Sequence, residues 1–162
     1  MKNIVDKNII FYTLLVPLSL QGIPAQAQNA NNNIVVSGQS TSWSLTSANN
    51  LENAQTLGNA ILLTVQSKNK KCSIYAMVSA SSTSTSTPMP ASLLALQLLS
   101  IVPSMSANFN AIPLSTSNQL LFQSSNSFNL ATLTYNLILG PVGYDYAPGT
   151  YSFTLLFTMT QP

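Results

Sequence analysis

The sequence contains no histidine and no arginine, and its only charged residues are 5 lysines and 3 acidic residues among 162. An ordinary domain is about a quarter charged. Without histidine there is no imidazole base for a Ser-His-Asp or Cys-His mechanism. With a single cysteine and no histidine, a zinc or copper site of ordinary composition is excluded as well. We therefore expect no metal, no cofactor and no catalytic residues.

The few charged residues narrow the remaining function classes. Glu52 and Asp145 are the minimum for glycosidase chemistry, but they fall in separate predicted loops, so we expect no catalytic pair. Binding to nucleic acid needs several phosphate-neutralising cations, and Lys68, Lys70 and Lys71 form the one basic cluster. A solvated loop explains these lysines better than contact with an anionic surface. The composition thus predicts a non-enzymatic protein without a nucleic-acid partner.

Cys72 is the only cysteine, so an internal disulfide is impossible and stability must come from buried apolar surface. It lies in phase with Ile74 and Val78 on one face of a predicted strand. That position favours a buried, inert thiol over a redox or cross-linking one.

The amino-terminal segment has the order of a secretory signal peptide. Lys2 and Lys7 precede an apolar run over 9–20, and Ala25-Gln26-Ala27 resembles a cleavage site. A membrane anchor is the alternative, but the run is shorter than the ~20 residues of a span, and Pro17 interrupts it. We predict a signal peptide over 1–27 and one secreted domain over 28–162, without a transmembrane segment. Its location would be periplasmic, cell-surface or extracellular.

Alternation of apolar and polar residues predicts strands through most of that domain. Residues 42–46 suggest a half-buried strand, and 61–66 and 72–78 suggest a β-hairpin with Asn69 at positive φ in its loop. Leu133, Tyr135, Leu137 and Leu139 share one face of a strand over 130–139. The strongest alternation places Tyr151, Phe153, Leu155, Phe157 and Met159 on one face of the last strand.

The remaining segments are less regular. We expect a loop with one helical turn over 49–59, an exposed serine- and threonine-rich loop over 79–87, and a type II turn at Pro148-Gly149. Residues 91–102 fit neither period cleanly, and a strand is favoured over a helix. About seven strands with turns between them predict an all-β, immunoglobulin-like antiparallel β-sandwich.

The segment Tyr146-Ala147-Pro148-Gly149-Thr150-Tyr151-Ser152 leads into the final alternating strand. This end of the chain resembles secreted bacterial fimbrial-subunit-like, or pilin-like, β-sandwich domains, with a looser match through 61–78. The resemblance implies a surface or fimbrial role as a structural or assembly subunit. Its partners would be other copies of the chain or related subunits.

Two further hypotheses remain open at this level. Ile34 and Val36 follow the polar arm 28–33 and can pair with the chain's own sheet or be exchanged into a neighbouring copy. An adhesin-like or carbohydrate-binding module is the alternative function, with a glycan or host surface as partner. Its ligand would contact Trp43, Tyr144 or Tyr146, although a core tryptophan and an ordinary aromatic loop are the simpler interpretations.

Overall fold

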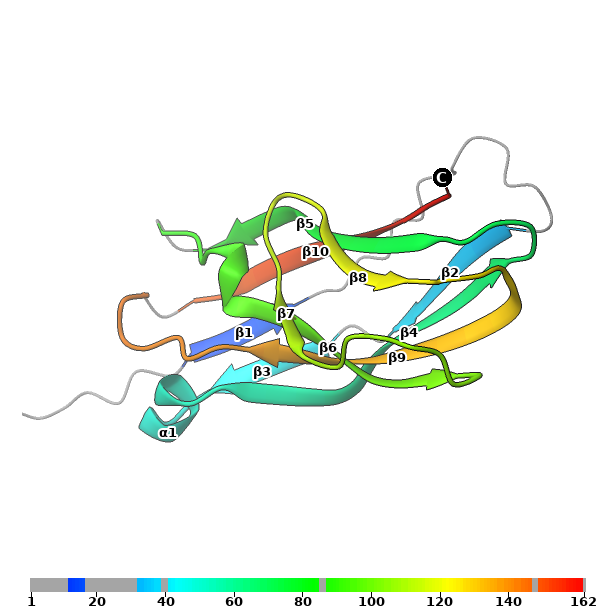
Figure 1. Ribbon diagram of the computed structural model, residues 1–162. Coiled ribbons are helices and arrows are strands. Elements are labelled where there is room, and N and C mark those ends of the chain that lie inside the picture. Colours follow the sequence, from blue (N-terminus) through cyan, green and yellow to red (C-terminus); the bar gives the residue numbers. More distant parts are fainter. Residues whose placement is uncertain (1–11, 17–31, 39–40, 85–86, 147–148, 162) are drawn as a thin grey trace, which may run out of the picture.

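A computed structural model of the chain describes residues 12–16, 32–38, 41–84, 87–146 and 149–161, with side chains from 32 onward except at 41 and 42 (Figure 1). Its strands are β1 (Tyr12–Val16), β2 (Asn32–Gly38), β3 (Thr41–Leu45), β4 (Gln55–Ser67), β5 (Ser73–Thr83), β6 (Leu94–Val102), β7 (Ala111–Pro113), β8 (Gln119–Gln123), β9 (Phe128–Leu139) and β10 (Tyr151–Thr160). One short helix, α1 (Ala48–Glu52), and one 3-10 turn, Ala91–Leu93, complete the described elements.

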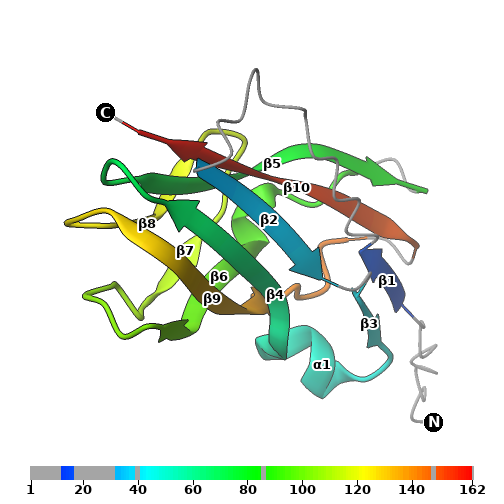
Figure 2. The same cartoon turned by 90° about the vertical axis from the view of Figure 1, so that its right-hand side faces the viewer.

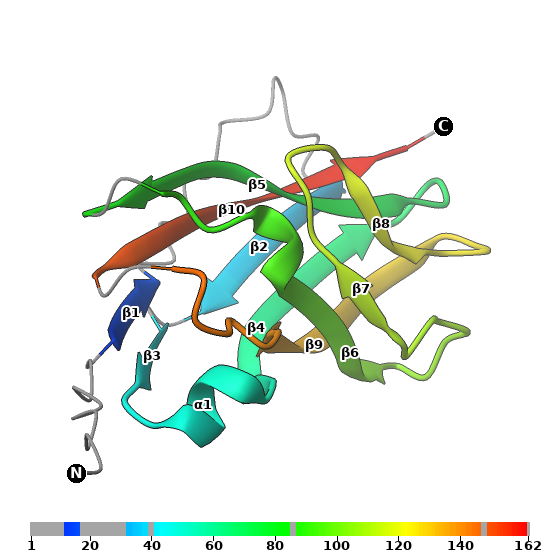
Figure 3. The same ribbon diagram turned by 90° about the vertical axis from the view of Figure 1, so that its left-hand side faces the viewer.

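The strands form two main antiparallel sheets. One has five strands in the order β2-β4-β9-β6-β7, and the other has three in the order β10-β5-β8. A separate two-stranded ladder joins β1 to β3. Figures 2 and 3 show the two main sheets facing each other, with β1 and β3 near one end. The predicted all-β sandwich is therefore confirmed, with more strands than the seven expected.

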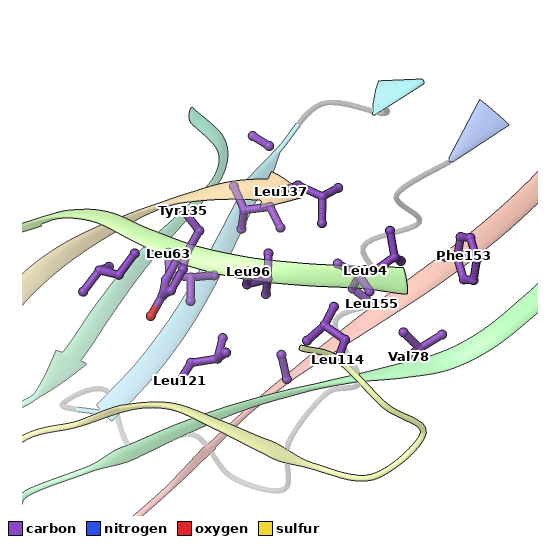
Figure 4. Packing of buried hydrophobic residues seen from close by; sticks show 14 of the residues in the cluster. Leu63, Val78, Leu94, Leu96, Leu114, Leu121, Tyr135, Leu137, Phe153 and Leu155 are labelled. Carbon is purple, nitrogen blue, oxygen red and sulfur yellow. The ribbon is translucent and has the colours of Figure 1, made fainter. Parts of the chain in front are cut away.

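The core lies between the two sheets and depends most on β9. Its alternation buries one side chain in two, and the predicted face of Leu133, Tyr135, Leu137 and Leu139 is fully buried. The neighbouring strands β4 and β6 supply the same face with further aliphatic residues. Figure 4 shows Leu63, Leu96, Tyr135 and Leu137 of this sheet on one side of the core, with Leu121 and Leu155 of the opposite sheet on the other. The buried residues added by β4 and β6 are Ile61, Leu63, Val65, Leu94, Leu96 and Leu98.

The expected hairpin between 61–66 and 72–78 is wrong. Strand β4 belongs to the five-stranded sheet and β5 to the three-stranded sheet, so the chain crosses from one layer to the other at residues 68–72. The two apolar runs face each other across the core instead of pairing side by side. Alternation identifies a buried face but not which strand lies beside it, so the sequence pattern fits both arrangements.

The residue with positive φ was also predicted at the wrong position. It is Asn59, at φ 53°, and not Asn69. Asn59 lies in β4 where the register against β9 shifts between Leu57 and Ile61, and its N–H donates to Asn136 Oδ1 at 3.1 Å. Asparagine tolerates this backbone region better than most residues. The break that the sequence suggested as a loop is therefore a bulge inside a long strand.

Two predicted loops are partly strand. Residues 79–83 continue β5 and pair with the start of β10, with Ser81 opposite Phe153. Pairing with a partner strand supplies the order that the serine- and threonine-rich composition of this segment does not predict. Similarly, β4 begins at Gln55, directly after the expected helical turn α1. The turn predicted at Pro148 lies outside the described residues.

Other expectations are confirmed. Residues 94–102 form a strand, which settles the ambiguity over 91–102 in favour of β structure after a single 3-10 turn. The last strand buries Tyr151, Phe153 and Leu155, but Phe157 is only partly buried. Core packing thus weakens toward the end of β10.

This gradient along β10 predicts unequal costs of truncation. Phe153→Ala should lower the free energy of unfolding by ~3–5 kcal/mol, because a fully buried aromatic side chain leaves a cavity. Phe157→Ala should cost clearly less, since its site is open to water. Urea unfolding followed by circular dichroism measures both. Equal costs for the two variants would contradict this account of the core.

Tyr135 carries an unusual group for the centre of a core. Its hydroxyl is buried without a hydrogen-bond partner, and Figure 4 shows it pointing across the core toward Leu121. Burial raises the pKa of this phenol well above its ordinary value. An unpaired buried hydroxyl lowers the free energy of unfolding by about 1–3 kcal/mol. The aromatic ring fills the core at this position, and its hydroxyl is the destabilising part.

We therefore expect Tyr135→Phe to stabilise the protein by roughly 1 kcal/mol at neutral pH. The folded state favours the protonated phenol, so wild-type stability should be unaffected below pH of about 10 and fall as the pH rises further. The advantage of Tyr135→Phe should grow over the same range. Urea unfolding at several pH values measures this. Tyr135→Leu, which removes the ring, should destabilise; a similar loss in Tyr135→Phe would mean that the hydroxyl is paired.

Candidate assembly site

The short strand β1 occupies a distinctive place in the fold. It pairs antiparallel with β3 along its whole length, from Tyr12 opposite Leu45 to Val16 opposite Thr41. Figures 2 and 3 both show β1 between β3 and the beginning of β10, although no ladder joins it to β10. Strand β1 thus lies between β3 and the β10 edge of the three-stranded sheet.

Strand β3 supplies core side chains from beside β1. Trp43 and Leu45 are 6% and 1% exposed, and both belong to the main hydrophobic cluster. The indole Nε1 of Trp43 is buried without a hydrogen-bond partner. Because the ring is enclosed, it has no open face on which a sugar could stack. The suggestion that Trp43 contacts a ligand in this state is therefore not supported by its position.

Three buried residues, Ser67, Cys72 and Ser124, form hydrogen bonds where the chain crosses between the sheets. Cys72 donates its N–H to Ser124 Oγ at 2.8 Å, and Ser124 N–H donates to the Cys72 carbonyl at 2.9 Å. The Ser124 hydroxyl also lies 3.8 Å from Cys72 Sγ. Ser67 donates to the Lys70 carbonyl at 2.7 Å, which closes the turn. These contacts tie the crossing to the end of β8.

The Cys72 thiol is fully buried, as predicted. Burial raises its pKa, and hydrogen bonding with Ser124 and then Ser67 partly opposes that effect. The thiolate is the reactive form. A buried thiol with a raised pKa is poorly suited to redox or cross-linking chemistry.

Cys72 should therefore react with a thiol reagent at least roughly a hundredfold more slowly in the native protein than in urea, because labelling requires local opening. Colourimetric labelling at pH 8 measures both rates. Ser124→Ala removes the side chain that accepts from the Cys72 N–H, and it should speed native labelling. Rapid labelling of the unaltered native protein would contradict the buried assignment.

The aromatic loop after β9 meets α1 at one corner of the molecule. Gly143, at φ 65°, donates its N–H to the Leu51 carbonyl at 2.9 Å, a left-handed conformation that suits glycine. Tyr144 is 61% exposed and donates its hydroxyl to Glu52 Oε1 at 2.8 Å. Two loops that look separate in sequence therefore converge here.

Tyr146 differs from Tyr144. It is partly buried and packs edge-on against Tyr151, with ring centroids 6.4 Å apart. Its ring thus contributes to packing at the start of β10. Of the three aromatic residues proposed as ligand contacts, Tyr144 alone has a largely exposed side chain.

Ile34 and Val36 lie in β2, which pairs with β4 of the same chain. Ile34 stands opposite Val65 and Val36 opposite Leu63. Both side chains are partly buried against the core. In this state the segment completes its own sheet, and its donation to a neighbouring copy stays a prediction.

A shallow hollow of about 350 Å³ opens on the surface of the molecule. It lies between the segment after β6 and the β8–β9 connection, with Met105 beside hydroxyl and amide groups. No three histidine, cysteine or acidic side chains gather as a metal site among the described residues. No described helix is long and apolar enough to cross a membrane.

Comparison with known proteins does not assign the chain to a family. No protein-family model matches it, and no curated protein matches it.

The ladder between β1 and β3 is the feature that sequence reasoning missed. The alternation over 42–46 indicated a half-buried strand there, which the structure bears out at Trp43 and Leu45. Its partner was not foreseen, because residues 12–16 lie in the apolar run that predicted a signal peptide. The length and apolarity of that run fit a leader and a strand equally.

Proposed function

We propose that this protein is a secreted, non-enzymatic subunit of a bacterial surface fibre, assembled by adding a strand from one copy or a related subunit to the next. The observation that carries the proposal is the place of β1, because this strand comes from the segment that we expect to be removed at Ala27. Loss of Tyr12–Val16 would leave β3 without a ladder partner among the described strands.

The space left by β1 suits an incoming strand. Main-chain hydrogen bonds along β3 would provide affinity, and the region around Trp43 and Leu45 would provide apolar contacts. Strand β1 pairs with β3 along its whole length. A segment that takes its place would therefore have to be extended as well. The resemblance of the carboxyl end to pilin-like domains supports the same kind of assembly.

The distribution of charge also supports association between copies. After residue 27 the charged side chains are Glu52, Lys68, Lys70, Lys71 and Asp145. None of them lies on β1, β3 or β10. Subunits with so few charges repel one another weakly, so neighbouring copies can approach closely.

Trp43 allows a direct test, because it is the single tryptophan of the chain. A bacterium secreting the full chain should release protein that begins at Gln28 and forms ladders on gels run without boiling. Monomers of that protein should show red-shifted tryptophan emission, since β1 no longer covers β3, and assembled protein should show blue-shifted emission. Intact mass, gels and fluorescence measure the three expectations.

Recovery of Met1 in the extracellular protein would contradict the processing step. A protein starting at Gln28 that stays monomeric at high concentration, with emission typical of a buried indole, would contradict assembly at this site. Trp43→Phe removes the fluorescent side chain but keeps an aromatic ring beside β1, so this variant should still form ladders.

Exposure of Tyr144 favours one second candidate, a glycan-binding or adhesin-like module. Its hydroxyl is held by Glu52, so the ring is fixed while remaining open to a ligand. An exposed aromatic ring beside a carboxylate is a common way to hold a sugar. Monomeric protein retained on a glycan array, with retention lost in Tyr144→Ala, would favour this function over a fibre subunit.

A further inference from the structure

We propose that the outer edge of β2 is a lateral contact between two copies of this chain, which pair antiparallel, β2 against β2. The contact would join two five-stranded sheets into one continuous sheet. It goes beyond the proposed fibre assembly, which takes place at β3. The lateral contact uses the β2 edge of the five-stranded sheet, and β2 stays paired with β4. Figure 2 shows β2 at the margin of its sheet, with β4 on one side and β10 of the other sheet close to its start, although no ladder joins β2 to β10.

The edge of β2 lacks the features that normally prevent edge-to-edge pairing. Its seven residues, Asn-Asn-Ile-Val-Val-Ser-Gly, include no charged side chain and no proline. Its register against β4 is unbroken from Asn32 to Gly38, so no bulge twists the edge away. Proteins usually guard an edge of this length with lysine, proline or a bulge.

The other edges of the two main sheets are short or irregular. Strand β7 has three residues and ends in Pro113. Strand β8 has a register shift against β5 between Ile74 and Tyr75. Strand β10 has a register shift against β5 between Thr154 and Leu155. None of these edge strands carries a charged side chain, and among them β2 has an unbroken register over seven residues.

Charge selects the orientation of the pair. The lysine loop, formed by Lys68, Lys70 and Lys71, is fixed at the start of β2 because Lys68 N–H donates to Asn32 Oδ1 at 3.1 Å. Antiparallel pairing centred on Val35 places the two lysine loops at opposite ends, roughly 20 Å apart, which is about two and a half times the Debye length in physiological salt. Parallel pairing would bring six lysines together.

Side-chain burial agrees with an edge strand that has one ladder partner. Val35 is 50% exposed on the outer face, opposite Thr64 of β4. On the inner face Ile34 and Val36 are only partly buried, whereas their partners Val65 and Leu63 are fully buried. In the antiparallel pair Ile34 of each copy would stand beside Val36 of the other, and both would gain cover.

A single strand pair is a small interface, so we expect weak association of isolated copies. The same contact repeated along two fibres becomes strong through multivalency. It therefore fits lateral bundling of fibres, while strand addition at β3 would build each fibre. The partner is a second copy of this chain, because an antiparallel edge of this sequence is complementary to itself.

Cysteine cross-linking of the full chain tests the register. In the antiparallel pair the two Val35 Cα atoms lie about 4.5–5.5 Å apart, which a disulfide can bridge. Val35→Cys should therefore form covalent dimers under mild oxidation. The native Cys72 is buried and should not take part. Thr64→Cys is the matched control on the same sheet face, one strand farther from the partner, and should cross-link at least about tenfold more slowly.

Orientation is tested by mixing two variants. Antiparallel pairing places Asn33 of one copy opposite Ser37 of the other, so Asn33→Cys mixed with Ser37→Cys should form the heterodimer. Neither variant alone should form a dimer efficiently. Equal cross-linking of Val35→Cys and Thr64→Cys, or efficient self-linking of Asn33→Cys, would overturn the proposal.

A charge on the edge separates this contact from fibre assembly. Val35→Lys should weaken lateral self-association at least about tenfold in sedimentation experiments, because two lysines would face each other. Thr64→Lys adds the same charge away from the edge and should leave association near the wild-type value. Ladders on non-boiled gels should persist in both variants. Unchanged sedimentation of Val35→Lys, or loss of its ladders, would contradict a lateral contact at β2.

Discussion

The whole structure depends on the buried side of β9 and the strands beside it. Leu133, Tyr135 and Leu137 lie at the centre of the five-stranded sheet and face the second sheet across the core. No disulfide can assist them, because the chain has one cysteine. Apolar burial between the two sheets must therefore supply most of the stability. The unpaired hydroxyl of Tyr135 shows that filling this layer takes precedence over satisfying every polar group.

The same scarcity of charge links stability to assembly. Nearly all charge in the expected mature chain lies in the lysine loop and at the corner where Glu52 meets Tyr144. The edge strands carry hydroxyl, amide, aliphatic and aromatic side chains and no charged ones. A surface of this kind cannot rely on electrostatic repulsion to keep copies apart. Edge geometry, through bulges, short strands and proline, then decides where copies can meet.

Much of the fold could be predicted from alternation alone, because a half-buried strand repeats every two residues. The faces of 130–139 and 151–155 follow directly from that period. Pairing could not be predicted, because the runs at 61–66 and 72–78 fit neighbouring strands and facing strands equally well. Tyr144 was predicted as a contact residue, but its bond to Glu52 joins loops far apart in sequence. The β1–β3 ladder was missed because an apolar leader and a strand share one composition.

The long-range pairing of β5 with β10 affects how such a chain must be produced. Ser81 stands opposite Phe153, so this ladder closes only when residues more than seventy positions apart meet. Contacts of such high sequence separation form slowly. Until β10 is available to fold, the edge of β5 that it occupies stays without its ladder partner. An unpaired strand edge is prone to aggregation, so the incomplete sandwich is exposed to that hazard for the whole of this interval.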